Sequence, residues 1–244
     1  MTVQELLASM DICEIDTSVI AGIGWASHEL CVENNEYILE CSARYPHRLV
    51  GLVSIQPQAG NEALLELERC VHSGVKGIGE MRADTQGFDL TSGAFTDIVD
   101  YLVTHNLVLL SHSSEPVGHD YPGKGALTPE IIYPFIMRHP DLKIVLAHWG
   151  GGLPFYAAMP EVKAIFTNVY FDTAASPYLY SPSVYRQVLD IVGSEHVIFG
   201  SDYPLISPMR ALAEIRSSDL AESVQSAVIG GNAQRLFGLG TGHD

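Results

Sequence analysis

The chain is 244 residues long, with 47% hydrophobic and 17% charged residues. This length fits one domain the size of an α/β barrel, about 250 residues. No stretch has the composition of a linker, so we expect a single domain over residues 1–244. The 29 acidic and 13 basic residues give a formal net charge of −16. Such a surface repels phosphate backbones and anionic lipids, which argues against nucleic-acid and membrane partners.

The amino-terminal segment MTVQELLASMDI has neither the basic start nor the apolar run of a signal peptide. No run approaches the ~20 apolar residues of a membrane span, so we expect a cytoplasmic protein. The four cysteines lie in the first third of the chain without a CxxC pair, at Cys13, Cys31, Cys41 and Cys70. We expect buried, reduced thiols with no metal or disulfide role.

The hydrophobic pattern predicts alternating strands and helices along the chain. Apolar residues at positions 3, 6, 7 and 10 form a helical stripe at the start. Seven apolar, β-branched runs then predict strands at 18–24, 49–55, 75–81, 107–112, 143–148, 168–173 and 196–202. Helices are expected near 33–45, 61–73, 91–105, 128–139, 154–166, 182–193, 208–217 and 219–237, followed by an irregular tail over 240–244.

Three of these helices have a clear start signal, a hydroxyl residue followed by proline: Thr128, Ser181 and Ser207. Strands that are apolar on both faces, each followed by a helix, are typical of a parallel sheet covered by helices. Seven or eight such units favour a closed barrel over a doubly wound sheet. The sequence therefore predicts an α/β protein with a TIM-type (β/α) barrel.

Three of the predicted strands end in a chemically active side chain: His112 ends LVLLSH, His148 ends KIVLAH and Asp202 ends VIFGSD. The carboxyl ends of strands are where parallel α/β folds bind ligands and carry out catalysis. Alternation along the strands predicts which side chains share a face with these three. The expected groupings are His112 with Val108 and Leu110, His148 with Ile144 and Leu146, and Asp202 with Ile198 and Gly200. If those faces point inward, the three groups meet at the mouth of the barrel.

Imidazole and carboxylate groups together suit a divalent ion such as Zn²⁺, which lowers the pKa of bound water to about 7. Glu80 follows the strand GVKGIGEM and is a further candidate ligand or general base. Arg82 is placed to clamp a substrate carboxylate. The alternative is that Glu80 and Arg82 pair with each other at the strand end. His28, in the loop GWASHEL, is either a substitute ligand or a solvated loop residue.

Further residues near the expected mouth are candidates for substrate binding. His119 lies in the loop PVGHDYPGKG, where it can contact an anionic substrate. Trp149 and Tyr203 follow strand ends, where they can line a pocket. Ordinary loop packing is the alternative for both aromatic residues.

The segments SHSS, VLAHWGG, NVYFDTA, VIFGSDYP and GGNAQRLFGL resemble the second half of the amidohydrolase-related family of metal-dependent hydrolases. Within that family they are similar to the branch that contains aminocarboxymuconate-semialdehyde decarboxylase and related decarboxylases and lactonases. The resemblance implies a TIM barrel in which His112 is a metal ligand. It also implies that His148 is the general acid/base or a second ligand, and that Asp202 is a ligand and proton acceptor.

One departure from this family concerns its first strand, which carries a His-x-His pair of metal ligands. No His-x-His occurs in the 244 residues, and the seven predicted strands correspond to strands two to eight. Either the true start lies upstream of Met1 or the strand has been lost. We therefore expect an incomplete barrel with seven of the eight strands. Its metal is expected to be weak, partial or absent unless Glu80, His28 or a partner chain completes the ligand set.

The resemblance implies a metal-dependent hydrolase or decarboxylase acting on a small, carboxylated or cyclic substrate. The alternative is a catalytically degenerate barrel that binds a small molecule or serves in an assembly without metal. A missing strand leaves a gap between the strands at 18–24 and 196–202. Unpaired strand edges invite pairing with another chain, so we expect a homodimer.

Overall fold

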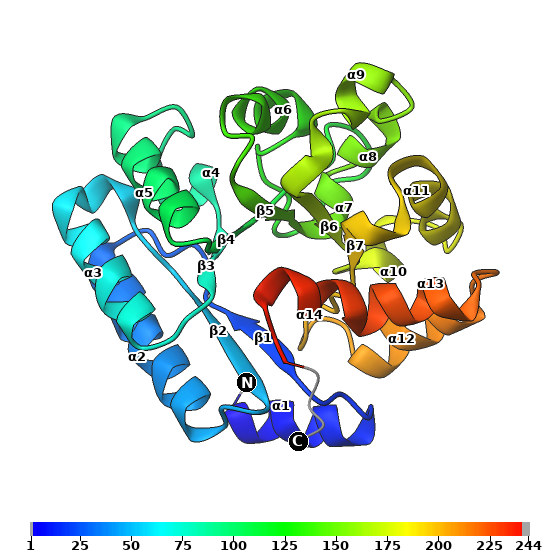
Figure 1. Ribbon diagram of the computed structural model, residues 1–244, viewed down its shortest axis with the longest axis horizontal. Coiled ribbons are helices and arrows are strands. Elements are labelled where there is room, and N and C mark those ends of the chain that lie inside the picture. The colour runs from blue at the N-terminus through cyan, green and yellow to red at the C-terminus, as the bar shows by residue number, and fades with distance from the viewer. Residues whose placement is uncertain (1, 241–244) are drawn as a thin grey trace.

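The computed structural model describes residues 2–240, so the predicted tail over 240–244 lies almost entirely outside the described residues. Its centre is one seven-stranded parallel sheet in the order β1-β2-β3-β4-β5-β6-β7. The strands are β1 (Ser18–Ala21), β2 (Leu49–Val53), β3 (Gly77–Met81), β4 (Val108–Ser111), β5 (Lys143–Leu146), β6 (Val169–Asp172) and β7 (Val197–Ile198). Figure 1 shows the strands curling into an incomplete barrel with helices on its outside, as predicted.

The longer helices occur where the periodicity predicts them: α1 (Val3–Ile12), α2 (His28–Arg44), α3 (Asn61–His72), α5 (Gly93–Thr104), α6 (Pro129–Arg138), α11 (Val184–Val192) and α12 (Pro208–Ser217). The predicted helix over 154–166 is instead broken into α8 (Leu153–Tyr156), α9 (Pro160–Lys163) and the 3₁₀ turn η2 (Phe166–Asn168). Pro160 explains the break, because proline cannot continue a preceding helix.

The predicted last helix is also divided. It consists of α13 (Glu222–Ser226), the π-helical segment η4 (Ala227–Gly231) and α14 (Asn232–Phe237). The remaining short elements are η1 (Pro57–Ala59), α4 (Ala83–Gln86), α7 (Ala147–Gly150), α10 (Ser176–Leu179) and η3 (Ser194–His196). Thr128 and Ser207 occupy N-cap positions before proline, yet neither side chain makes a capping hydrogen bond. The prediction for Ser181 is wrong, because the N-cap of α11 is Ser183.

The sheet has an outer face that packs against the helices and an inner face that lines the barrel. The outer core includes Ile144 and Leu146 of β5. The inner cluster includes Val108 of β4, with Leu110 packed against it, and Val145 of β5. The phase predicted for β4 is therefore confirmed and the phase predicted for β5 is wrong. Regular alternation along β5 would carry His148 to the outer face.

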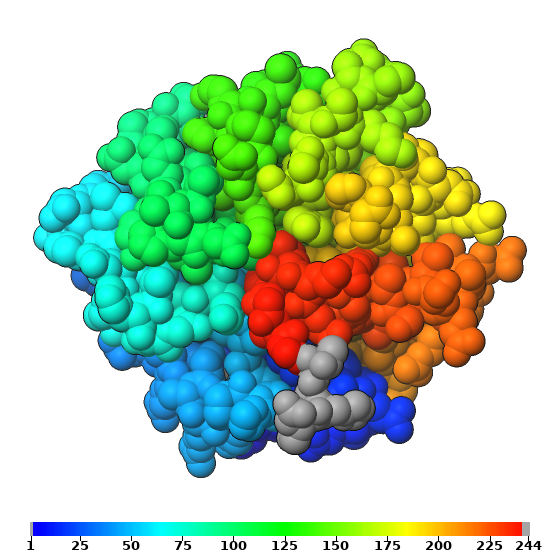
Figure 2. Space-filling view, viewed as in Figure 1, coloured from blue at the N-terminus to red at the C-terminus, as the bar shows by residue number. Residues whose placement is uncertain are grey.

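The C-terminal helix α14 closes the end of the barrel at which the strands begin. Leu236 and Phe237 are buried in the inner cluster. Arg235 and Leu236 also share a hollow with Lys143, the first residue of β5. In Figure 2 this C-terminal segment, in red, covers the centre of the face in view.

The sheet remains open between its two edge strands, where the sequence predicts a gap. The β7 edge is covered by the C-terminal segment: Val228 accepts a hydrogen bond from the Phe199 N–H (2.9 Å), and the Asn232 side chain donates to the Val197 carbonyl (2.6 Å). On β1, the Ser18 and Gly22 N–H groups point to β2. Alternation therefore turns the main-chain groups of Val19 and Ala21 toward the gap, and both residues are exposed.

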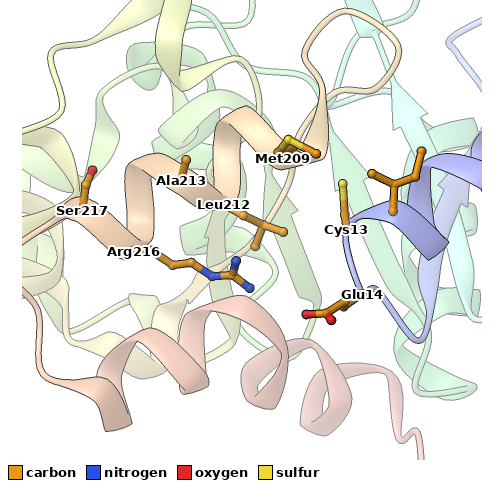
Figure 3. A pocket seen from close by; sticks show the side chains of 8 residues that line it. Cys13, Glu14, Met209, Leu212, Ala213, Arg216 and Ser217 are labelled. Atoms are coloured by element: carbon orange, nitrogen blue, oxygen red, sulfur yellow. The ribbon is translucent and has the colours of Figure 1, made fainter.

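A groove runs along the outside of this gap, between the end of α1 and α12. Its volume is about 530 Å³, and its lining includes Cys13, Glu14, Met209, Leu212 and Arg216 (Figure 3). The groove therefore separates the end of α1 from α12.

Two predictions from composition can be checked directly. Among residues 2–240, no helix is both long enough and apolar enough to cross a bilayer. The four cysteines are buried, free thiols, as predicted. Burial raises the pKa of Cys31 to about 11, so that thiol is protonated at neutral pH.

Replacing Phe237 with alanine should lower the free energy of unfolding by about 3–5 kcal/mol, because it empties part of the inner cluster. Urea denaturation followed by circular dichroism measures this change. Met137, which is 55% exposed on α6, provides the control. Its alanine variant should stay within about 0.5 kcal/mol of the wild type, and equal stability of the two variants would contradict the role of α14.

Candidate metal centre

Three side chains converge at the carboxyl ends of neighbouring strands: Glu80 on β3, His112 after β4 and His148 after β5. One ligand atom of each lies within 4.8 Å of the other two. Glu80 Oε1 is 2.7 Å from His112 Nδ1 and 3.6 Å from His148 Nε2. The two imidazole rings are 5.0 Å apart at their centroids. The arrangement is a compact group of two imidazoles and one carboxylate.

Glu80 faces inward because β3 is irregular. Ile78 and Met81 both lie in the outer core, although regular alternation would place them on opposite faces. The register of β3 against β4 shifts between these two residues. This shift turns the Glu80 side chain toward the barrel interior, a change that alternation in the sequence cannot reveal.

His112 extends the inner face of β4, in phase with Val108 and Leu110. Its N–H donates to the Met81 carbonyl (2.9 Å), which continues the pairing of β3 and β4 by one residue. The ring is held at both nitrogens, by Glu80 through Nδ1 and by the Ser114 hydroxyl through Nε2 (3.1 Å). Its orientation is therefore determined by two side chains.

His148 reaches the site through a turn rather than through strand phase. Its backbone is left-handed, with φ 57° and ψ 48°. The buried Asp172 carboxylate stabilises this turn by accepting from the His148 N–H (2.9 Å) and the Ala174 N–H (3.0 Å). His148 Nδ1 lies 3.4 Å from the Ala174 carbonyl, so Nε2 faces Glu80.

The charges of this group are strongly coupled. Burial raises the pKa of Glu80, but hydrogen bonds from His112 and His148 outweigh it and hold that pKa well below its usual range. Burial lowers the pKa of His148, but the hydrogen bond to Glu80 and the charges of Asp172 and Asp202 raise it to about 9. At neutral pH without a metal, the Glu80 carboxylate and the His148 imidazolium form an ion pair.

Asp202 lies at the mouth but outside the group of three. It follows β7 and has a left-handed backbone, φ 61°. Its side chain is exposed to solvent at the mouth, yet protein atoms crowd it enough that burial raises its pKa. Its charge is close enough to contribute to the raised pKa of His148.

Two of the candidate substrate-binding residues, Arg82 and His119, lie in the segments that follow β3 and β4. Arg82 is half-buried, and its guanidinium donates to the Gly123 carbonyl (2.9 Å). Its Nε atom is buried without a hydrogen-bond partner among the described residues. His119 is exposed on the loop after β4, with its ring 5.6 Å from that of Tyr121.

The structure does not bring the other candidates into this group. Trp149 is fully buried, and its Nε1–H donates to Ser176 Oγ (2.6 Å). Tyr203 packs against the cluster formed by buried residues of α1, α2 and β2. His28 begins α2 after the N-cap Ser27 and is not part of the metal-ligating group. For Trp149 and Tyr203 the packing alternative describes what the structure shows.

The donor set fits a divalent transition-metal ion. Two imidazoles and a carboxylate are ligands that Zn²⁺ and related ions accept. Atoms about 2.1 Å from one ion lie about 3.0–3.4 Å apart. Glu80 Oε1 lies 2.7 Å from His112 Nδ1 and 3.6 Å from His148 Nε2. Each of these two distances would have to change by only a few tenths of an ångström to fall in this range.

Two residues that support the site, Asp172 and Ser114, were not identified from the sequence. Asp172 is the last residue of β6 and the last but one of the segment NVYFDT, so the polar strand-end signal that identified His112 and His148 also applied to it. Ser114 lies in the motif SHSS beside His112, and its hydroxyl carries no comparable signal. Its contact with the ring depends on the fold of the following loop.

In metal-free protein, the free energy of unfolding should fall as the pH rises from about 6.5 to 9. The pKa of His148 is raised in the folded state, so its stabilising contribution is fully present below the unfolded pKa and is lost as the pH passes the folded one. The expected loss is on the order of 2–3 kcal/mol. Urea titrations at several pH values, with a chelator present, measure it. A His148→Gln variant should make the free energy of unfolding nearly independent of pH in this range, whereas the exposed His72→Gln control should keep the wild-type dependence. If both variants show the same pH dependence, His148 is not its source.

Comparisons with known proteins identify the family of this chain. Residues 5–239 match the Amidohydrolase family model Amidohydro_2. A relative from Dictyostelium discoideum, 2-amino-3-carboxymuconate-6-semialdehyde decarboxylase, is 23% identical over 237 residues, covering 84% of this chain and 65% of the relative. The chain thus spans slightly less than two thirds of that protein. Gamma-resorcylate decarboxylase from Polaromonas sp. is 22% identical, covering 87% of this chain and 77% of the relative.

Solved structures show the same fold. The 5-carboxyvanillate decarboxylase of Sphingomonas paucimobilis superposes with a TM-score of 0.81 at 23% identity, covering 97% of this chain and 83% of the other. A dihydroxybenzoic acid decarboxylase from Polaromonas sp., solved with bound manganese and an inhibitor, gives a TM-score of 0.75 at 18% identity, covering 98% and 86%. The family match over nearly the whole described chain, together with this barrel, shows that the protein belongs to the amidohydrolase family.

Proposed function

We propose that this chain is a divalent-metal-dependent decarboxylase of small aromatic carboxylates. The observation that carries the proposal is the convergence of Glu80, His112 and His148 within 4.8 Å at the strand ends. The names of the relatives support decarboxylation over hydrolysis, which the sequence leaves open.

In this proposal Glu80, His112 and His148 hold the ion. His148 suits the role, because Nδ1 faces a backbone carbonyl and Nε2 faces Glu80, an orientation typical of metal-ligating histidines. A relative of the same fold was solved with manganese, so we propose Mn²⁺, with the expected Zn²⁺ as the alternative. When bound, the ion supplies positive charge that stabilises negative charge developing on the substrate.

The residues around this group handle the carboxylate and the proton. Decarboxylation breaks the bond between the ring carbon and the carboxylate carbon; CO₂ leaves, and the electron pair stays on the ring carbon, which takes a proton. Asp202 is the proton donor in this proposal, because burial raises its pKa and it lies outside the ligand group. Arg82, whose Nε atom lacks a partner among residues 2–240, binds the departing carboxylate.

These roles differ from the family-based expectation in one respect. That expectation makes Asp202 a ligand and His148 the acid/base group. The geometry favours the exchange of these two roles, because His148 belongs to the compact group and Asp202 does not. The degenerate, metal-free barrel is the competing function, and metal uptake separates the two.

The wild type, loaded with Mn²⁺ or Zn²⁺, should release CO₂ from members of a panel of hydroxybenzoates. His112→Ala and His148→Gln should lose stoichiometric metal, measured by elemental analysis after dialysis. Asp202→Asn should keep the metal while kcat falls about 10²–10⁴-fold, the range expected for loss of an acid/base group.

His105→Asn, at the exposed C-cap of α5 and at the opposite end of β4 from His112, is the control and should behave as wild type. Wild-type protein that takes up no metal and releases no CO₂ would favour the metal-free barrel. Metal loss in Asp202→Asn with retention in His148→Gln would restore the family-based assignment of roles.

We further propose that the chain forms a homodimer through the open β1 edge. The main-chain groups of Val19 and Ala21 face the gap, and the exposed apolar side chains of Ile12, Val19 and Ile23 lie at or beside β1. Antiparallel pairing of two β1 edges about a two-fold axis would satisfy the amides and cover these side chains together.

Sedimentation velocity at low micromolar concentration should therefore show a dimer. Val19→Lys should shift it to monomer, because a charge at the paired edge opposes association. Leu65→Lys, at a position 56% exposed on α3, should remain dimeric. A monomeric wild type would rule out the dimer.

A further inference from the structure

Ser114 connects the metal centre to the loop that follows β4. It is fully buried, two residues after His112. Its Oγ lies 3.1 Å from His112 Nε2 and accepts a hydrogen bond from the Gly125 N–H (2.8 Å). The hydroxyl therefore lies between a fixed loop amide and the ring of a proposed ligand.

A count of donors and acceptors shows what this hydroxyl can do. A serine hydroxyl has one proton to donate and two lone pairs. The Gly125 N–H occupies one lone pair. Toward His112 the hydroxyl retains one proton and one lone pair, so it can donate to Nε2 or accept from it.

The metal-free site needs a hydroxyl that donates to Nε2, and the metal-bound site needs one that accepts from it. Without a metal, His112 Nδ1 lies 2.7 Å from Oε1 of Glu80, so the tautomer with its proton on Nδ1 donates to that carboxylate. Nε2 is then unprotonated and accepts from Ser114. A cation shared with Glu80 and His148 requires the Nδ1 lone pair instead. The ring then carries its proton on Nε2, and Ser114 accepts it.

We propose that Ser114 is a positioning residue that hydrogen-bonds both tautomers of His112 and so allows its Nδ1 to pass from the Glu80 carboxylate to a metal ion. This inference rests on the proposed metal site. One proton leaves Nδ1 to solvent and one is taken up from solvent at Nε2, so the charge of the ring is the same before and after. A carboxylate at position 114 could only accept and an ammonium only donate, whereas a hydroxyl does both.

The surroundings hold Ser114 in this place. Its N–H donates to the Leu127 carbonyl (2.8 Å). A Cβ on Gly151 would approach the Ser114 carbonyl oxygen to 2.3 Å, so the segment that carries Gly151 packs directly against the backbone of Ser114. Asp84 accepts from the Ala126 N–H (2.9 Å) and thereby fixes the loop that carries Gly125. Only the hydroxyl proton is free to change its direction.

The test compares Ser114→Ala with Ser113→Ala. Ser113 is an equally buried hydroxyl that donates to the Ala147 carbonyl and makes no hydrogen bond to His112. Calorimetric titration with Mn²⁺ should show a Kd raised 10–100-fold in Ser114→Ala, the usual effect of losing a partner behind a metal-bound histidine. Ser113→Ala should stay within about threefold of wild type, although both variants lose a buried hydrogen bond of ordinary strength.

Nitrogen-15 NMR of the histidine rings provides a second readout that needs no activity. In metal-free wild type, His112 should carry its proton on Nδ1, and its Nε2 resonance should move in Ser114→Ala but not in Ser113→Ala. Addition of diamagnetic Zn²⁺ should transfer the proton to Nε2. A wild-type ring protonated on Nε2 before metal addition would overturn the proposal.

The two ways of failing can be told apart. If wild type and Ser114→Ala bind Mn²⁺ equally well, the role of Ser114 is refuted while the metal centre stands. If the wild type takes up neither ion, the proposed function and the tautomer exchange are both refuted.

Discussion

A carboxylate enclosed at the end of β3 is the constraint around which the site is arranged. Withdrawing an ionised carboxylate from water costs several kcal/mol unless opposite charge and hydrogen bonds compensate. Two imidazoles compensate here, and they must come from adjacent strands to reach one oxygen atom. Parallel pairing of β3 with β4 and of β4 with β5 places the three strand ends side by side. The same pairing that compensates the charge assembles a metal-ligating group.

A second buried carboxylate, Asp172, stabilises the turn that brings His148 to Glu80. His148 and Trp149 are both left-handed, which costs about 1–2 kcal/mol for each residue with a side chain. Two backbone N–H groups donate to Asp172 across this turn, and hydrogen bonds to a carboxylate are stronger than neutral ones. Trp149 adds burial of a large side chain. The turn is therefore held by Asp172 on one side and by packing on the other.

The sequence predicts the seven strands and the longer helices because their hydrophobic periodicity reflects burial directly. It predicts the inward direction of His112 for the same reason, since β4 is regular. It fails for His148, where a left-handed turn overrides strand phase, and it is silent about the direction of Glu80, where the register of β3 shifts. Both departures arise from backbone irregularities that alternation does not encode. The contact between Ser114 and Gly125 depends on loop folding and was equally inaccessible.

The candidate ligand group lies where every strand is paired on both sides, whereas Asp202 lies beside an edge strand. Glu80 lies on β3, and His112 and His148 follow β4 and β5; each of these strands has a strand on both sides. Asp202 follows β7, whose outer edge is covered by the C-terminal segment instead of a strand. Asp202 is therefore attached to the part of the barrel next to the gap, and the three candidate ligands to its continuous part. If Glu80, His112 and His148 hold an ion as proposed, three protein ligands would leave a coordination position open, as catalytic metal sites require, and the substrate would bind there.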